Sequence, residues 1–70
     1  GQLDRARSAL ELALLARPDY ATAHENMGDV YLQMAAAAYQ RAATLQPSNR
    51  AASSKLALTR EMITKARSPR

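Results

Sequence analysis

Residues 27–46 read MGDVYLQMAAAAYQRAATLQ, and this stretch decides the fold. After Asp29 it contains no glycine, proline, asparagine or serine, and residues 35–38 are four consecutive alanines, the strongest helix former. Apolar side chains recur at steps of three and four residues, the spacing of one face of an α-helix. This apolar row consists of Met27, Tyr31, Met34, Ala38, Ala42 and Leu45. We therefore expect residues 20–46 to form one uninterrupted helix.

Two further helices are expected on either side of this one. The first covers about residues 4–16 and ends before Pro18, which lacks an N–H donor and disfavours helical geometry at the preceding residue. Its apolar row consists of Leu3, Ala6, Leu10, Ala13 and Leu14. The second covers about residues 49–66, after a Pro-Ser-Asn break at residues 47–49. Its apolar face consists of Ala52, Leu56, Ile63 and Ala66, with Met62 at the edge. The expected fold class is all-α.

Composition argues against several classes of function. The 70 residues include no cysteine, and His24 is the single histidine, which we expect to pack near the first helix. Neither a zinc ligand set, a Gly-rich phosphate loop nor a nucleophile motif is present, so we expect no enzyme, no cofactor and no metal site. No apolar run reaches the roughly 20 residues that a membrane span needs. The composition is compatible with either the cytoplasm or the periplasm.

One spacing occurs twice in the chain. A set of four residues at offsets 0, 4, 7 and 12 recurs 29 residues later. The first set is Ala6, Leu10, Ala13 and Pro18, and the second is Ala35, Tyr39, Ala42 and Pro47. Internal periodicity of this size is typical of arrays of helical hairpins, in which each unit buries its apolar face against its neighbours.

The second set, with the residues before it, resembles the tetratricopeptide repeat (TPR), whose signature is W-x2-L-G-x2-Y, then A-x3-F, then P. Met27, Gly28 and Tyr31 stand at the Leu, Gly and Tyr positions, and His24 stands where the family prefers an aromatic residue. The resemblance covers nearly the whole chain and implies a TPR-like α-solenoid fragment over residues 1–67. Residues 1–18 would be the second helix of a partial repeat, 19–47 one repeat, 48–67 a C-terminal capping helix, and 68–70 a tail.

The chain departs from this family at one point. A family repeat has 34 residues, whereas Pro18 and Pro47 are 29 residues apart. The missing residues belong to the turn between the two helices of the repeat, because Met34 leads directly into the alanine run. We therefore expect the two helices of this repeat to be fused into the long central helix; the alternative is a tight turn near residues 33–36, in a stretch without glycine.

The resemblance implies a non-enzymatic protein–protein interaction or scaffold module, the C-terminal part of a larger TPR protein. The face that would line its concave surface consists of Thr22, Glu25, Asn26, Asp29, Leu32 and Gln33. Two carboxylates on this face favour a basic or amphipathic peptide over one that ends in a carboxylate. The competing interpretation is an ordinary solvated helix face.

A second interpretation concerns the basic C-terminal segment. Residues 1–49 carry four arginines and five carboxylates, net −1, whereas residues 50–70 carry six cations and Glu61, net +5. Such a segment could bind nucleic acid or an anionic membrane surface. Its cations recur every five residues, which spreads them around the helix, and no aromatic residue lies among them for base stacking. Nucleic-acid binding is therefore the less favoured alternative.

The fused helix also predicts self-association. Without the turn, its two halves cannot pack on each other, so part of the apolar row needs cover from another chain. We expect a homodimer in which two long helices pack antiparallel around a two-fold axis near residues 34–38. The candidate residues for this contact are Tyr31, Met34, Ala35, Ala38 and Tyr39, of which both tyrosines are also expected to be core residues.

Restoring the missing turn tests this interpretation. Insertion of Gly-Gln-Leu-Asp-Arg, the sequence of residues 1–5, between Met34 and Ala35 should let the helix fold back into a hairpin and yield a monomer. Small-angle scattering should report a shorter maximum dimension than for the parent chain. An insertion of five alanines is the matched control and should leave the helix extended.

Overall fold

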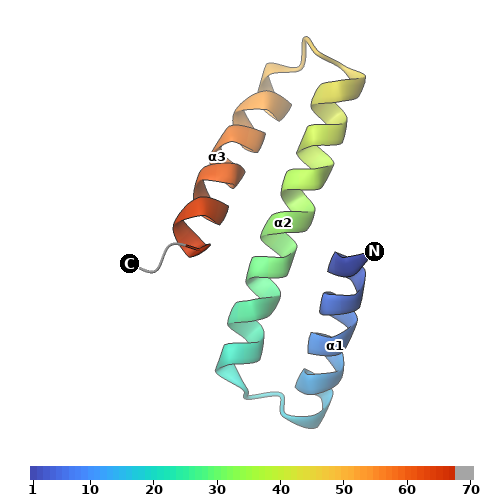
Figure 1. The fold of residues 1–70 in the computed structure, drawn as a ribbon, viewed down its shortest axis with the longest axis vertical. Coiled ribbons are helices and arrows are strands. Elements are labelled where there is room, and N and C mark those ends of the chain that lie inside the picture. The colour runs from blue at the N-terminus through green and yellow to red at the C-terminus, as the bar shows by residue number, and fades with distance from the viewer. Residues whose placement is uncertain (68–70) are drawn as a thin grey trace. The chain divides into compact units, whose positions relative to one another are not determined.

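A computed structural model describes residues 1–67, and these form three α-helices (Figure 1). Helix α1 spans Gln2–Ala16, α2 spans Ala21–Leu45 and α3 spans Arg50–Arg67. The described residues contain no strand. The all-α prediction is confirmed, and the expected helix ends differ from the observed ones by at most two residues. The predicted tail, residues 68–70, lies outside the described residues.

Helix α2 is continuous across the alanine run. All 25 of its residues are helical, with no interruption at residues 33–38 (Figure 1). At about 1.5 Å per residue such a helix is roughly 37 Å long. The predicted uninterrupted helix is confirmed, because a turn here would have to leave helical geometry at several alanines with no glycine to help.

The chain divides into two compact units, Gly1–Tyr31 and Leu32–Arg70, called unit 1 and unit 2 here. Unit 1 is an antiparallel hairpin of α1 and the first part of α2. Unit 2 is an antiparallel hairpin of the remaining part of α2 and α3 (Figure 1).

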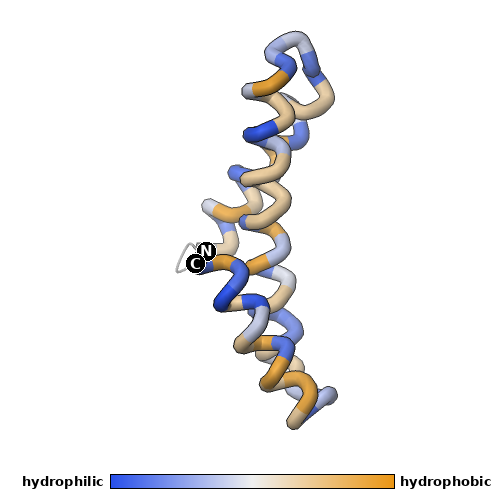
Figure 2. The backbone as a smooth tube through the Cα atoms, turned by 90° about the vertical axis from the view of Figure 1, so that its right-hand side faces the viewer, coloured by the Kyte–Doolittle hydropathy of each residue, from blue (hydrophilic) through white to orange (hydrophobic). Residues whose placement is uncertain are grey.

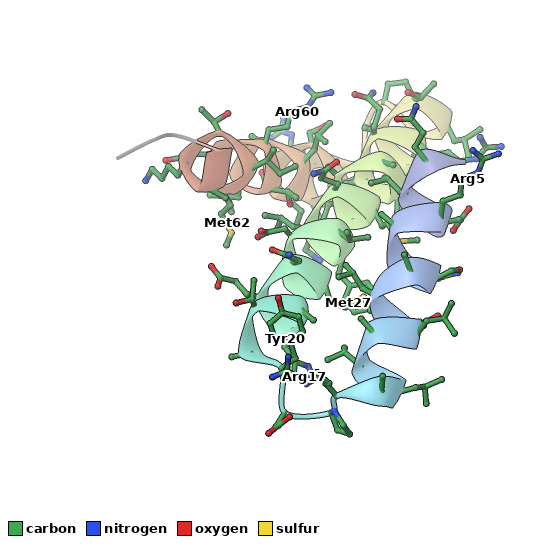
Figure 3. The ribbon with its side chains drawn as sticks, turned by 60° about the horizontal axis from the view of Figure 1, so that its bottom comes forward. Arg5, Arg17, Tyr20, Met27, Arg60 and Met62 are labelled. Carbon is green, nitrogen blue, oxygen red and sulfur yellow. The ribbon has the colours of Figure 1, made fainter. Side chains whose placement is uncertain are left out.

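In unit 1, α2 provides the buried side chains and α1 covers them. Ala23, Met27 and Val30 are buried, and Met27 lies between the two helices (Figure 3). The five apolar residues predicted for the first helix are all half-buried, as is Arg7. Val30 was absent from the predicted row. Tyr31 was expected in the core, and this is wrong: its side chain is 49% exposed, because it lies one residue beyond Val30 and so about 100° further around the helix.

In unit 2, α3 provides the buried side chains. Ala52 and Leu56 are buried as predicted, together with Thr59, which the sequence analysis did not include. The Thr59 hydroxyl donates to the Lys55 carbonyl oxygen at 2.6 Å, and this bond satisfies a polar group that would otherwise be costly to bury. Ala66, predicted on the same face, is exposed near the end of the helix.

The pattern of burial repeats with the same 29-residue interval as the sequence. The three buried residues of unit 1, Ala23, Met27 and Val30, correspond to the three of unit 2, Ala52, Leu56 and Thr59. The six half-buried residues of α1 likewise correspond to six half-buried residues of α2. The α1 residues are Leu3, Ala6, Arg7, Leu10, Ala13 and Leu14; their α2 counterparts are Leu32, Ala35, Ala36, Tyr39, Ala42 and Ala43. The two units therefore share one pattern of burial.

Each of the two turns that connect the helices contains a side-chain contact. In the first, the Arg17 guanidinium lies 4.9 Å from the centre of the Tyr20 ring, a cation–π contact (Figure 3). In the second, which is hydrophilic in Figure 2, the Asn49 side-chain oxygen accepts a hydrogen bond from the Ala52 backbone N–H at 2.9 Å. Asn49 is thus the N-cap of α3, and it satisfies one of the free N–H groups of the first turn.

Removing this cap tests its contribution. Asn49→Ala should lower the free energy of unfolding by about 1 kcal/mol, since the Ala52 N–H then loses its partner. Urea unfolding followed by circular dichroism measures the loss. Ser48→Ala is the matched control in the same turn. An equal loss in both variants would contradict a specific role for the Asn49 side chain.

Candidate interaction groove

Unit 1 carries an open groove of about 630 Å³ along its two helices. Helix α1 lines it with Glu11, Leu14 and Leu15, and α2 lines it with His24, Met27 and Tyr31. Four of these six side chains are apolar or aromatic. The groove has the mixture of apolar lining and few polar groups that is typical of binding sites.

Two large side chains at the groove remain uncovered by unit 1 itself. Leu15 is 79% exposed and Tyr31 is 49% exposed. Leu15 follows Leu14, which is half-buried against α2, and the step of one residue turns it about 100° away from that contact. Met27, 7% exposed, provides an apolar floor with a flexible thioether side chain.

The polar groups of the groove are few. Glu11 is the single charged residue that lines it. The His24 Nε2–H donates to the Pro18 carbonyl oxygen at 2.8 Å, the only role open to that nitrogen because a carbonyl oxygen can only accept. This bond holds the imidazole beside the turn. The expectation of a packed His24 is wrong, since the residue is exposed and lies at the groove.

Four of the six equivalent positions of unit 2 are polar. The 29-residue interval takes the groove residues to Gln40, Ala43, Thr44, Ser53, Leu56 and Arg60. There the Gln40 side-chain amide donates to the Thr44 hydroxyl at 3.2 Å, and Arg60 donates to the Gln40 side-chain oxygen. The polar groups of this surface in unit 2 thus form hydrogen bonds with one another, whereas unit 1 exposes the apolar side chains of Leu15 and Tyr31 at the equivalent positions.

None of the six residues of the sequence-predicted partner face lines the groove. Thr22, Glu25, Asn26 and Asp29 are exposed on unit 1, on the part of α2 turned away from His24 and Tyr31. In unit 2, Gln33 is exposed and Leu32 is half-buried. The structure adds Glu11, Leu14 and Leu15 as candidate site residues, which the sequence analysis did not assign to a site. The adjacent pair Leu14-Leu15 was the available signal, because one helix face cannot bury both.

The five candidate self-association residues differ in exposure. Tyr31, in unit 1, is exposed, and so is Ala38 in unit 2. Met34, Ala35 and Tyr39 are half-buried. Ala35 and Tyr39 belong to the repeated set of α2 residues that unit 2 already uses in its own hairpin.

Among the described residues, no group of three histidine, aspartate or glutamate side chains is arranged to hold a metal ion. No described helix combines the length and the apolar character needed to cross a membrane.

Comparisons with protein families, with curated proteins and with solved structures find no match for this chain. The likeness to tetratricopeptide repeats therefore stays a prediction from the residues of the chain itself.

A substitution of Gly28 tests whether the helix surface beside the groove is open, as the structure shows it. A Cβ atom built at Gly28 would meet no atom within 4 Å, so nothing in the chain requires a glycine in the interior of α2. Gly28→Ala should therefore raise the free energy of unfolding by roughly 0.5–1 kcal/mol in dilute solution. Urea unfolding measures the change, and Ala37→Gly, on the exposed surface of the same helix, should lower stability by a similar amount. A destabilised Gly28→Ala variant would contradict the open surface.

Proposed function

We propose that this chain is a non-enzymatic protein-interaction module that binds an apolar helical segment of a protein in the groove of unit 1. The observation that supports this most is the pair Leu15 and Tyr31, exposed above Met27 at a place where unit 2 is polar and hydrogen-bonded. Unit 2 shows that polar residues are compatible with this surface of the hairpin. The exposed apolar residues of unit 1 are therefore not needed for the hairpin itself and suit a binding partner.

The energetics favour an amphipathic helix as the ligand. A helix can lay its apolar face in such a groove, and fully covering a leucine side chain contributes about 1.5–3 kcal/mol. Glu11, at the edge, favours a basic residue on the incoming segment. This agrees with the basic or amphipathic peptide expected from the sequence, although the face is a different one.

The module is proposed as the terminal part of a larger TPR-like scaffold. The repetition of one hairpin supports a repeat architecture, and the hydrogen-bonded surface of unit 2 is of the kind that ends a repeat array. Self-association is part of the proposal, because a second copy is a partner that is always present.

A second candidate function is binding to an anionic membrane surface or nucleic acid through α3. Leu58 and Met62 are exposed one turn apart on α3, and Lys55 lies near them on the same face, as in an interfacial amphipathic helix. Against it, Lys65 pairs with Glu61 at 3.4 Å and Arg60 donates to Gln40, so two cations have internal partners. Binding to anionic vesicles or DNA with a salt slope of several units would favour this candidate.

A peptide titration tests the proposed function. The probe is an 18-residue helical peptide with leucine on one face and arginine on the other, added to isotope-labelled protein. Amide shifts should cluster at the residues that line the groove, and Leu15→Glu should remove most of the binding because it places a second carboxylate in an apolar site.

Leu12→Glu is the matched control, since Leu12 is 67% exposed on the same helix and does not line the groove. A peptide with glutamate in place of arginine should bind more weakly. The proposal fails if Leu12→Glu and Leu15→Glu weaken binding equally, or if the shifts cluster at Thr22, Glu25, Asn26 and Asp29, which do not line the groove.

A further inference from the structure

We propose that the groove of unit 1 binds residues 38–45 of α2 from a second copy of this chain, with Arg41 of that copy against Glu11. This rests on the proposed function, because it names the partner of that same groove and the residues that make the contact.

The first observation is an uncovered apolar row in unit 2. Ala38 is exposed and Leu45 is 74% exposed, although α3 packs along the same part of α2. Ala38 and Leu45 are seven residues apart and therefore lie on one face of the helix, with half-buried Ala42 between them. This is a narrow apolar face of the kind that a helical groove accommodates.

The second observation is charge complementarity. Arg41 is the single charged residue among residues 32–45, and it is three residues from Ala38 and four from Leu45, on the same side of the helix. Glu11 is the single charged residue of the groove. Neither side chain makes an ion pair within the part of the chain that the structure describes. An intermolecular pair of Arg41 and Glu11 gives each a partner of opposite sign.

The charges of the two units favour the same arrangement. Unit 1 carries three arginines and five carboxylates, net −2, and unit 2 carries seven cations and one carboxylate, net +6. An antiparallel pair of α2 helices brings unit 1 of each copy to unit 2 of the other, opposite in sign. A parallel pair, or contact of groove with groove, brings like charges together.

The register of such a pair also agrees with side-chain size. When two α2 helices run antiparallel with their centre between Met34 and Ala35, Tyr31 lies opposite Ala38 of the second copy. In the same register Gly28 lies opposite Arg41 of the second copy, and the space beside Gly28 is open. Large residues thus face small ones, which permits close packing. The contact is made twice by symmetry, so the pair closes as a dimer.

Cysteine cross-linking tests the arrangement, because the chain has no cysteine of its own. Leu15→Cys in one copy and Leu45→Cys in another are mixed and oxidised, and the expected major product is the disulfide between the two variants. Leu12→Cys with Leu45→Cys is the matched control and should give little product, because Leu12 does not line the groove. Leu15→Cys with Met62→Cys tests the rival in which α3 of the second copy occupies the groove; that pair as the major product would overturn the proposal.

Sedimentation equilibrium tests the charge pair. The parent chain should sediment at twice the 7.6 kDa of one chain, and Glu11→Arg or Arg41→Glu should each weaken the dimer by about tenfold. The double variant should recover most of the affinity, because the pair is re-formed with its signs exchanged. Arg5→Glu, outside the groove, is the control, and circular dichroism verifies that every variant stays helical.

The outcomes separate this inference from the proposed function. A dimer without the Leu15–Leu45 cross-link, or without rescue in the double variant, overturns the arrangement and leaves self-association. A parent chain that is monomeric at high micromolar concentration overturns the second copy as partner. The groove would still be a protein-binding site if it then bound the basic amphipathic peptide and Leu15→Glu removed that binding.

Discussion

The structure depends on the continuity of α2 through residues 33–38. All residues from Ala21 to Leu45 are helical, including the four alanines at residues 35–38. The first part of α2 pairs with α1 in unit 1, and the remaining part pairs with α3 in unit 2. The two hairpins, their division into units and the apolar side chains left on α2 all follow from this one constraint.

The same constraint explains why few side chains are buried. The six residues below a tenth exposure are mostly of modest size, and two of them are alanine. Each hairpin consists of two helices, and Leu15, Tyr31 and Leu45 stay exposed in the part of the chain that the structure describes. Uncovered apolar area of this kind is costly in water, and its cover by another polypeptide is favourable. The proposed interaction function is therefore linked to the continuity of α2.

Comparison of the two units is more informative than either unit alone. The buried and half-buried positions of the two units match at a 29-residue interval. Packing within the hairpin therefore does not explain why the exposed residues of the two units differ. At the groove, unit 1 has Glu11, Leu15 and Tyr31 where unit 2 has Gln40, Thr44 and Arg60. The burial pattern is the same, but the surface of unit 1 exposes apolar side chains, whereas side-chain hydrogen bonds link Gln40 with Thr44 and Arg60 in unit 2.

The sequence by itself determined the three helices, the continuity of α2 and the apolar row of α1, because propensity, proline positions and helical spacing are local properties. It did not determine which of two adjacent apolar residues is buried. Val30 is buried and Tyr31 is exposed, although the apolar row predicted from the sequence contained Tyr31, since a shift of about 100° around a helix matters only once the neighbouring helix is in place. The groove belongs to the tertiary structure for the same reason: Glu11 and Leu15 meet His24 and Tyr31 only when α1 packs antiparallel on α2.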